Sequence, residues 1–323
     1  LQPMGAVSVP SGTSQVLTTV TGDKAIVIAQ NSNAPVSFVT ISGGQVVGAA
    51  RPLNLNNQPA TFAALTPDGQ RLLVLGGFPA TLTIIDPVSE KVLTGGSLVV
   101  GAQPRGFVVT RDSKYAVVVC SPSLFTAVNL TTYAFETSFG MTGVTENPTI
   151  NMAPSGAIYV TARDVIIQFQ GGPPFNEVAR TTTSTGFVWP GKLEFSADGR
   201  YGITTNETAS GSSVLTYDFT VRGTNTPAGA VISQIPITFG DNVPKKMDAI
   251  TPISDTVALA YSAAIGRIFT VGYPVLSAAD LSLGGVGVPQ DVTGMALTNE
   301  FPTRRYLYYV TGNQVYRHDL VAN

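Results

Sequence analysis

The sequence predicts an all-β fold, a seven-bladed β-propeller with four antiparallel strands per blade and a ring closed by the N-terminal strand in the last blade. Three observations support it. Similar segments recur roughly every 45 residues, a period that is typical of propeller blades. Each segment alternates short apolar runs with tight polar turns. The chain also contains 33 glycines and 22 prolines, which disfavour long helices.

Prolines mark the repeat. Each stands before a short apolar run, which is followed by a polar turn and a second apolar run; these prolines are Pro59, Pro104, Pro148, Pro190, Pro244 and Pro289. The second repeat shows the pattern well, since residues 59–66 lead into the turn 67–70 and the apolar run 71–75. A third strand, often ending in Asp or Asn, and a fourth strand follow in each repeat. Four antiparallel strands in about 45 residues make one propeller blade.

The repeat predicts a single domain over residues 1–323. The expected blades are 10–52, 53–101, 102–145, 146–187, 188–241, 242–287 and 288–323 plus 1–9. The last repeat shows only three strands, whereas residues 4–9 form an apolar strand that precedes the first repeat. We therefore predict that residues 4–9 pair with the strand 314–319, which would remove the open sheet edges of an unclosed ring.

Composition limits the classes of partner and the location. Hydrophobic residues make up 44% of the chain and charged residues only 12%, with a net charge of −2 and a pI near 5.4. Such a chain has no basic field that would hold nucleic acid, so we predict no nucleic-acid partner. No run approaches the roughly 18 apolar residues of a membrane span. Low charge, Thr/Ser-rich strands and a first residue other than Met predict a secreted, periplasmic or cell-surface monomer.

One repeat resembles a known family. Residues 101–119 combine a Gly-x-x-Pro opening with a polar turn and the Val-rich strand Tyr-Ala-Val-Val-Val. This segment is similar to the repeat of the YVTN family of surface-layer propellers, whose turn is Ser-Pro-Asp-Gly. Thr66–Gly69 and Ser196–Gly199 match that turn, and the likeness weakens in the sixth and seventh blades. The resemblance implies a bacterial or archaeal surface propeller, related to lactonase-like propellers that use ionisable residues in their central channel.

Several kinds of chemistry are disfavoured by composition. With one His and one Cys, a Cys/His zinc site or a Cys–His nucleophile pair is nearly excluded. It contains no P-loop and no Gly-x-Ser-x-Gly motif. We therefore predict no metal and no cofactor. Cys120 stands in an apolar run, which predicts a buried and unreactive thiol, and His318 is interpreted as an ordinary strand residue.

A set of charges breaks the repeat. The second and fourth residues after the repeat proline are both charged in the fifth and sixth blades only, and residues i and i+2 of a strand share one face. Innermost strands line a propeller channel, so adjacent blades would present these charges near the axis, with two further cations at the channel mouth. The predicted ligand-binding residues are Arg105, Lys192, Glu194, Lys245, Lys246 and Asp248.

Two interpretations of these charges stay open. They form a site for an anion or a carboxylate-bearing molecule, or they are ion pairs that satisfy each other in a wet channel. We predict a non-catalytic extracellular or cell-surface propeller that binds a protein, glycan or small polar ligand. The alternative is a lactonase-like hydrolase with Glu194 or Asp248 as base and a lysine that stabilises the oxyanion. The tyrosine-rich last blade, residues 304–317, is a second candidate docking face.

Overall fold

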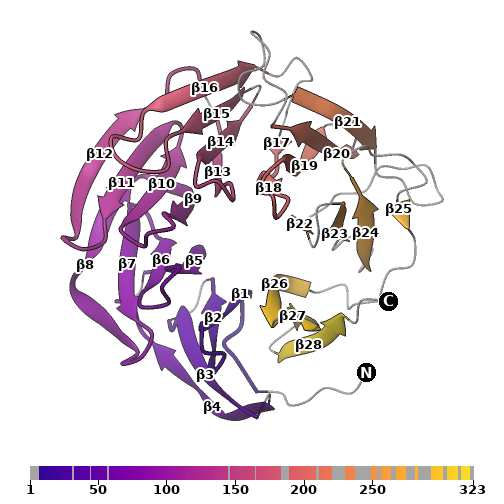
Figure 1. The fold of residues 1–323 in the computed structure, drawn as a ribbon. Helices are drawn as coiled ribbons and strands as arrows, with labels where there is room; N and C mark the ends of the chain where they lie inside the picture. Colours follow the sequence, from indigo (N-terminus) through magenta and orange to yellow (C-terminus); the bar gives the residue numbers. More distant parts are fainter. Residues whose placement is uncertain are drawn as a thin grey trace. The chain divides into compact units, whose positions relative to one another are not determined.

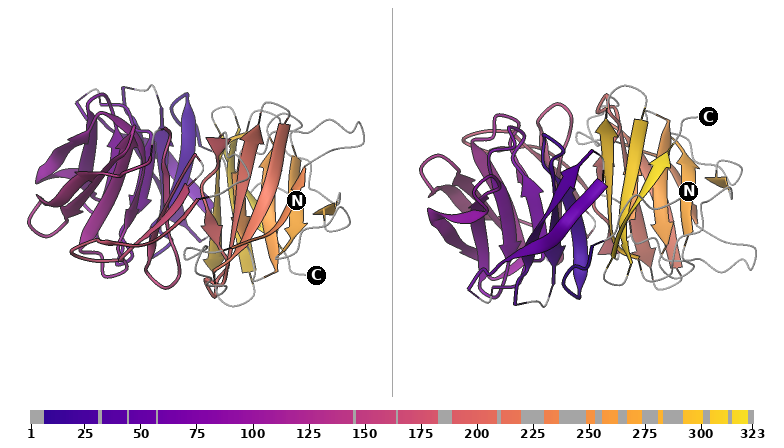
Figure 2. Two further views of the ribbon diagram at one scale, coloured as in Figure 1. Left: turned by 90° about the horizontal axis from the view of Figure 1, so that it is seen from above. Right: turned by 90° about the horizontal axis from the view of Figure 1, so that it is seen from below.

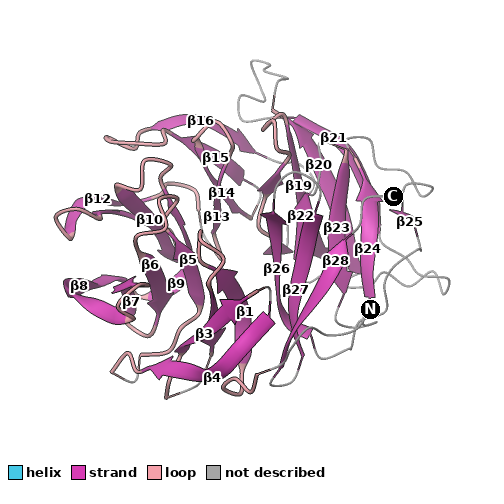
Figure 3. Ribbon diagram, turned by 60° about the horizontal axis from the view of Figure 1, so that its bottom comes forward, coloured by secondary structure: helices cyan, strands magenta, loops and turns pink. Residues whose placement is uncertain are grey.

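The structure is a computed structural model of the 323-residue chain. It describes residues 7–30, 33–43, 45–56, 58–144, 146–163, 165–182, 189–208, 211–219, 230–236, 249–252, 256–262, 267–273, 281–282, 292–300, 304–311 and 314–320. Within these ranges the regular structure consists of β-strands, joined by turns and loops (Figure 3). No helix there is long and apolar enough to cross a bilayer.

The chain divides into two compact units. The first unit comprises residues 1–104, 111–113 and 291–323, and the second comprises 105–110 and 114–290. Strands of the first unit are β1 (Thr13–Thr18), β2 (Lys24–Ala29), β3 (Val36–Ser42), β4 (Gln45–Leu53), β5 (Phe62–Leu65), β6 (Leu72–Gly76), β7 (Ala80–Asp86), β8 (Lys91–Gly101), β26 (Val292–Glu300), β27 (Arg304–Thr311) and β28 (Gln314–Leu320).

The remaining strands lie wholly or mostly in the second unit. They are β9 (Gln103–Val109), β10 (Tyr115–Ser121), β11 (Leu124–Asn129), β12 (Ala134–Gly140), β13 (Thr149–Met152), β14 (Ile158–Ala162), β15 (Val165–Phe169), β16 (Glu177–Thr182), β17 (Trp189–Pro190), β18 (Glu194–Phe195), β19 (Tyr201–Thr208), β20 (Gly211–Asp218), β21 (Ala230–Pro236), β22 (Ala249–Pro252), β23 (Val257–Ser262), β24 (Arg267–Gly272) and β25 (Leu281–Ser282).

Strands consecutive in sequence pair antiparallel into small meander sheets, each of which corresponds to a blade (Figures 1 and 2). In the described residues five sheets have four strands each: β1–β4, β5–β8, β9–β12, β13–β16 and β22–β25. The sheet β17–β21 has five strands because β17 and β18 pair separately with β19, and the sheet β26–β28 has three. The prediction of four strands in every one of seven blades is therefore met in five blades.

The first and last sheets of the chain are neighbours within the first unit. Strand β1 lies against β26, and it also contacts β27 and β5 (Figure 1). The predicted pairing of residues 4–9 with the strand 314–319 is not found in the described part of that segment, residues 7–9. Residues 7–9 form no strand, and the buried Val9 packs with Val16, Val27 and Val39 of the first sheet. Val9 is therefore buried by the first sheet, and residues 7–9 form no strand pairing with the last sheet.

The core forms where neighbouring sheets pack face to face. Middle strands such as β6 and β10 are buried along nearly their whole length, whereas the last strands β4 and β12 are mostly exposed. Apolar clusters join one sheet to the next. In the first unit Ile26 and Phe38 contact Leu72 and Val74. Full burial of such a side chain contributes about 1.5–3 kcal/mol, so packing between sheets is the main source of stability.

The predicted turns are present where the Thr/Ser-x-Asp-Gly pattern occurs. In the second sheet the Thr66 hydroxyl donates to Asp68 Oδ1 at 2.5 Å, and Gln70 N donates to the same oxygen at 3.0 Å. The fifth blade repeats this arrangement with Ser196 and Asp198, at 2.6 Å between hydroxyl and carboxylate. Side-chain bonds to the turn backbone explain why Asp stands at this position.

Candidate functional site

Lys192 and Glu194 form a direct ion pair at the start of the fifth blade. Glu194 lies in the short strand β18, and Lys192 lies two residues before it, outside the strand. The Lys192 Nζ atom is 2.9 Å from Glu194 Oε1. The lysine side chain is 54% exposed and the glutamate side chain 23% exposed. The predicted pairing of these charges is therefore present, with the ammonium at the surface and the carboxylate partly buried.

Asn151 holds this pair in place from the preceding blade. Its Nδ2 donates to Glu194 Oε2 at 3.0 Å and to the Leu193 carbonyl oxygen at 2.7 Å. Its Oδ1 accepts a bond from Met152 N at 2.9 Å. Both carboxylate oxygens of Glu194 thus have partners, Lys192 at one and Asn151 at the other. A chain of polar contacts runs from strand β13 to the surface ammonium.

Asn151 was not predicted, because positions in each repeat were counted from the repeat proline. The distance from that proline to the following turn differs between blades, so the count fell one residue out of register in the fourth blade. Counting back from the turn restores the match. Ala153 N donates to Ala157 O as Ser196 N donates to Tyr201 O, which makes Asn151 equivalent to Glu194.

A similar amide link occurs in the first unit. Gln15 of β1 donates from Nε2 to the Ala63 carbonyl oxygen at 2.8 Å and accepts at Oε1 from Ala63 N at 3.0 Å. Ala63 of β5 and Leu193 both stand three residues before the Thr or Ser of the turn. In both units, a side-chain amide therefore hydrogen-bonds backbone groups at the open edge of the next blade. Such backbone groups are costly to leave unpaired.

Arg105 lies in β9 and is half-buried. Its Nε atom is buried and has no hydrogen-bond partner among the described residues. No ion pair or hydrogen bond joins it to Lys192 or Glu194 in that part of the chain. The other predicted site residues, Lys245, Lys246 and Asp248, lie outside the described residues, as do the side chains of the tyrosine-rich last blade and of His318.

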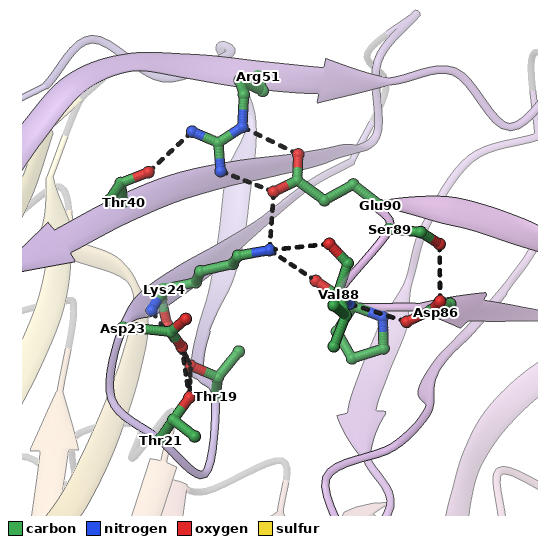
Figure 4. A network of polar contacts seen from close by, with 11 residues as sticks. Thr19, Thr21, Asp23, Lys24, Thr40, Arg51, Asp86, Val88, Ser89 and Glu90 are labelled. Carbon is green, nitrogen blue, oxygen red and sulfur yellow. Dashed lines mark hydrogen bonds and ion pairs between the residues drawn. The ribbon is translucent and has the colours of Figure 1, made fainter.

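A second polar network, which was not predicted, joins the first two sheets (Figure 4). Lys24 Nζ of β2 is 3.0 Å from Glu90 Oε1 and donates to the Pro87 carbonyl oxygen at 2.9 Å. Arg51 of β4 donates to both Glu90 oxygens, at 2.9 and 2.6 Å, and to Thr40 Oγ1 at 2.8 Å. The Arg51 hydrogen bonds, followed by that of Lys24, lower the pKa of Glu90. The charges of Lys24, Arg51 and Glu90 compensate one another. We call these three residues the clamp, because they link the two sheets.

Two further ionisable groups, Asp23 and Cys120, have structural surroundings. Thr19 donates to Asp23 at 2.6 Å, and this bond, with a second from Thr21, lowers the pKa of Asp23. Cys120 is 1% exposed, and burial raises its pKa to about 11, so its predicted burial is confirmed. No group of three or more potential metal ligands lies together in the described part of the chain.

Comparison with known proteins supports the fold class. No protein-family model and no curated protein matches the sequence. Among solved structures, the Kuenenia stuttgartiensis hydrazine synthase has a chain that aligns with a TM-score of 0.73. The alignment covers 97% of this chain and 97% of that chain, at 14% sequence identity. At so low an identity the likeness shows the fold alone. The chain is an all-β propeller.

Proposed function

We propose that this chain is a non-catalytic, exported propeller that binds a small anionic ligand through Lys192 and Arg105. Lys245 and Lys246 would add positive charge at the same channel mouth, with Asp248 paired to a lysine as Glu194 is to Lys192. We further propose seven blades in a single domain, a kinship with YVTN-type surface propellers, and a monomer located outside the cytoplasm. The blade period, the low charge and the quoted repeat support these last points.

The observation that carries the proposal is the positioning of the Lys192 ammonium. Asn151 fixes Glu194, and Glu194 fixes Lys192, while the lysine side chain stays 54% exposed. An ammonium has three N–H donors, so one bond to Glu194 leaves two that can meet a ligand oxygen. A cation held in place before binding loses less side-chain entropy when the ligand arrives.

Arg105 supports an anion in particular. A buried guanidinium N–H without an acceptor costs free energy, on the order of 1–3 kcal/mol for an unsatisfied group. A carboxylate, sulfate or phosphate oxygen would supply that acceptor, and guanidinium groups match such oxyanions geometrically. The arginine would gain a partner on binding, which adds to affinity.

The hydrolase alternative is less well supported by the same geometry. A general base must be oriented so that one of its oxygens reaches the proton that it takes from water or substrate. The Glu194 carboxylate is oriented towards groups of the chain, Lys192 at 2.9 Å and Asn151 at 3.0 Å. We therefore propose that Glu194 positions the lysine.

The proposal is tested by calorimetric titration with sulfate, phosphate, citrate and galacturonate. We expect wild-type protein to bind at least one of them, with an affinity that falls as salt increases. Lys192→Ala should weaken that binding at least five-fold because it removes the positioned cation. Lys91→Ala is the matched control, since it removes the same charge from an exposed site on β8 and should leave the affinity unchanged.

The structural interpretation of the same charges gives the opposite result. If wild-type protein binds none of these anions and Lys192→Ala lowers the melting temperature, the ion pair only stabilises the blade and the proposed function is wrong. Equal weakening by Lys91→Ala would show a nonspecific effect of net charge, which would also contradict the proposal.

A further inference from the structure

A hollow of about 320 Å³ opens between the end of β12 and the segment that joins β15 to β16. Phe139, Phe169 and Phe175 form its apolar wall, and Asn176 and Glu177 stand at its polar side. Ligand pockets usually have volumes of about 300–1,000 Å³ and combine aromatic walls with a few polar groups. The hollow therefore has the size and lining of a site for one small ligand.

The aromatic wall is held from behind. Phe139 stacks on Phe125, with 4.9 Å between ring centroids and 16° between ring planes. The ring centroid of Phe169 lies 6.1 Å from that of Phe139. Phe125, Phe169 and Phe175 are buried, whereas Phe139 is only partly buried. Phe175 also has a backbone φ of +57°, a strained conformation for a residue with a side chain. Such strained residues cluster at functional sites, so the conformation of Phe175 supports a functional role for this wall.

Arg180 fixes the polar side of the hollow. Its Nε and Nη2 atoms each donate to one oxygen of Glu177 at 2.8 Å, and Nη1 donates to the Thr142 carbonyl oxygen at 2.6 Å. The Glu177 side chain is 39% exposed, and each of its oxygens keeps a lone pair that can accept another hydrogen bond. Because Arg180 compensates the charge of Glu177, the hollow offers acceptors without net charge.

We propose that this hollow binds a single pyranose ring, either as a free neutral sugar or as the terminal residue of a glycan. A pyranose has one apolar C–H face and a rim of hydroxyl groups. The C–H face would lie against Phe139, and hydroxyls would donate to Glu177 and bond to the amide of Asn176. A volume of about 320 Å³ admits one ring rather than a chain of rings. The absence of a net charge favours a neutral sugar over a sugar acid.

This inference is independent of the anion site, because it uses a different set of side chains. The two proposals can fail separately. Lys192→Ala should leave sugar binding unchanged, and Phe139→Ala should leave anion binding unchanged.

Saturation-transfer NMR with the methyl glycosides of glucose, galactose and mannose and with N-acetylglucosamine tests the proposal. We expect transfer to at least one sugar in wild-type protein, with dissociation constants then measured by titration. Phe139→Ala should weaken binding at least ten-fold. Phe135→Ala is the control, because Phe135 lies on the same strand, is 54% exposed and does not line the hollow. Asn176→Ala, a change at an exposed residue, separates lost contacts from lost folding and should weaken binding several-fold.

Three outcomes would overturn the inference. The first is a wild-type protein that binds none of these sugars at millimolar concentration. The second is binding that Phe139→Ala and Asn176→Ala leave unchanged. The third is binding of indole or phenol in place of the sugars, which would show an aromatic-ligand site of another class.

Discussion

Glu90 accepts hydrogen bonds from two cations of the neighbouring sheet, Lys24 and Arg51, while its own backbone φ of +58° lies in the left-handed region. The turn that contains it is fixed by Asp86, which accepts from Val88 N at 2.8 Å and from Ser89 Oγ at 2.7 Å. Local turn chemistry therefore places the carboxylate, and the adjacent sheet supplies its partners. Such a group stabilises the junction between sheets rather than either sheet alone.

Glu90→Gln should lower the free energy of unfolding by about 1–2 kcal/mol near neutral pH, because two cations lose their anion. The pKa of Glu90 is lowered in the folded state, so its contribution is fully present above the unfolded pKa, about 4.3. That contribution is lost as pH falls through the lower folded-state pKa. Urea unfolding at neutral and at acid pH measures this, and the difference between wild type and variant should shrink in acid.

Glu136→Gln is the control for this prediction, since it removes a carboxylate from an exposed position on β12. It should change stability little at either pH. A Glu90→Gln protein as stable as wild type at neutral pH would contradict the clamp.

At the scale of the element, each blade depends on tight turns that contact the turn of the next blade. Gly69 closes the β5–β6 turn with φ of +70°, and a Cβ added there would lie 2.6 Å from Val20 Cγ2 in the β1–β2 turn. Asp68 N in the same turn donates to Ser113 Oγ at 3.1 Å. The turn is thus constrained by its own backbone and by its neighbours.

Gly69→Ala should destabilise the protein by about 1–3 kcal/mol, because the side chain meets both an unfavourable φ and a steric clash. The denaturant midpoint measures the change. Gly140→Ala provides the comparison, since a Cβ there has no neighbour within 4 Å and no positive φ is involved. Equal midpoints for the two variants would show that the turn can rearrange without cost.

Local patterns predicted the strands and turns, whereas contacts between blades escaped prediction. The apolar runs that became β6 and β10 are visible because burial on both faces leaves no polar residue in their buried parts. Lys192 and Glu194 were found because they are two residues apart in a segment that was predicted to be a strand. Asn151 and Lys24 were missed because their partners lie in another repeat. Equivalent positions in two repeats are found by aligning their turns, and the positions of the prolines do not give that alignment. Which residues of different blades contact each other depends on how the blades pack, and the sequence of a single repeat does not contain that information.

At the scale of the whole molecule, the N-terminal segment matters through burial. Val9 is 6% exposed against the first sheet, and the Pro10 carbonyl oxygen accepts from Thr13 Oγ1 at 2.7 Å. Residues 7–9 therefore cover apolar surface of that sheet. Their role differs from the predicted strand pairing, although both make the segment stabilising.

Deleting residues 1–10 should lower the melting temperature by several degrees, since losing the burial of one valine costs about 1.5–3 kcal/mol. Differential scanning calorimetry measures the shift. Val9→Ser should reproduce a large part of it, because it removes the same apolar contacts without shortening the chain. Unchanged melting of both proteins would mean that the segment contributes nothing to stability.

The contact of β1 with β26 also has a consequence for how the chain folds. It joins the first sheet to one whose strands begin at Val292, so it cannot form before the strands from Val292 onwards have been synthesised. Closing a loop costs about 0.6 kcal/mol more for each doubling of its length, and this contact closes the long loop from β1 to β26. Contacts within a meander involve short separations and form quickly. During synthesis the first sheet therefore exists for a time with the flank that contacts β26 uncovered.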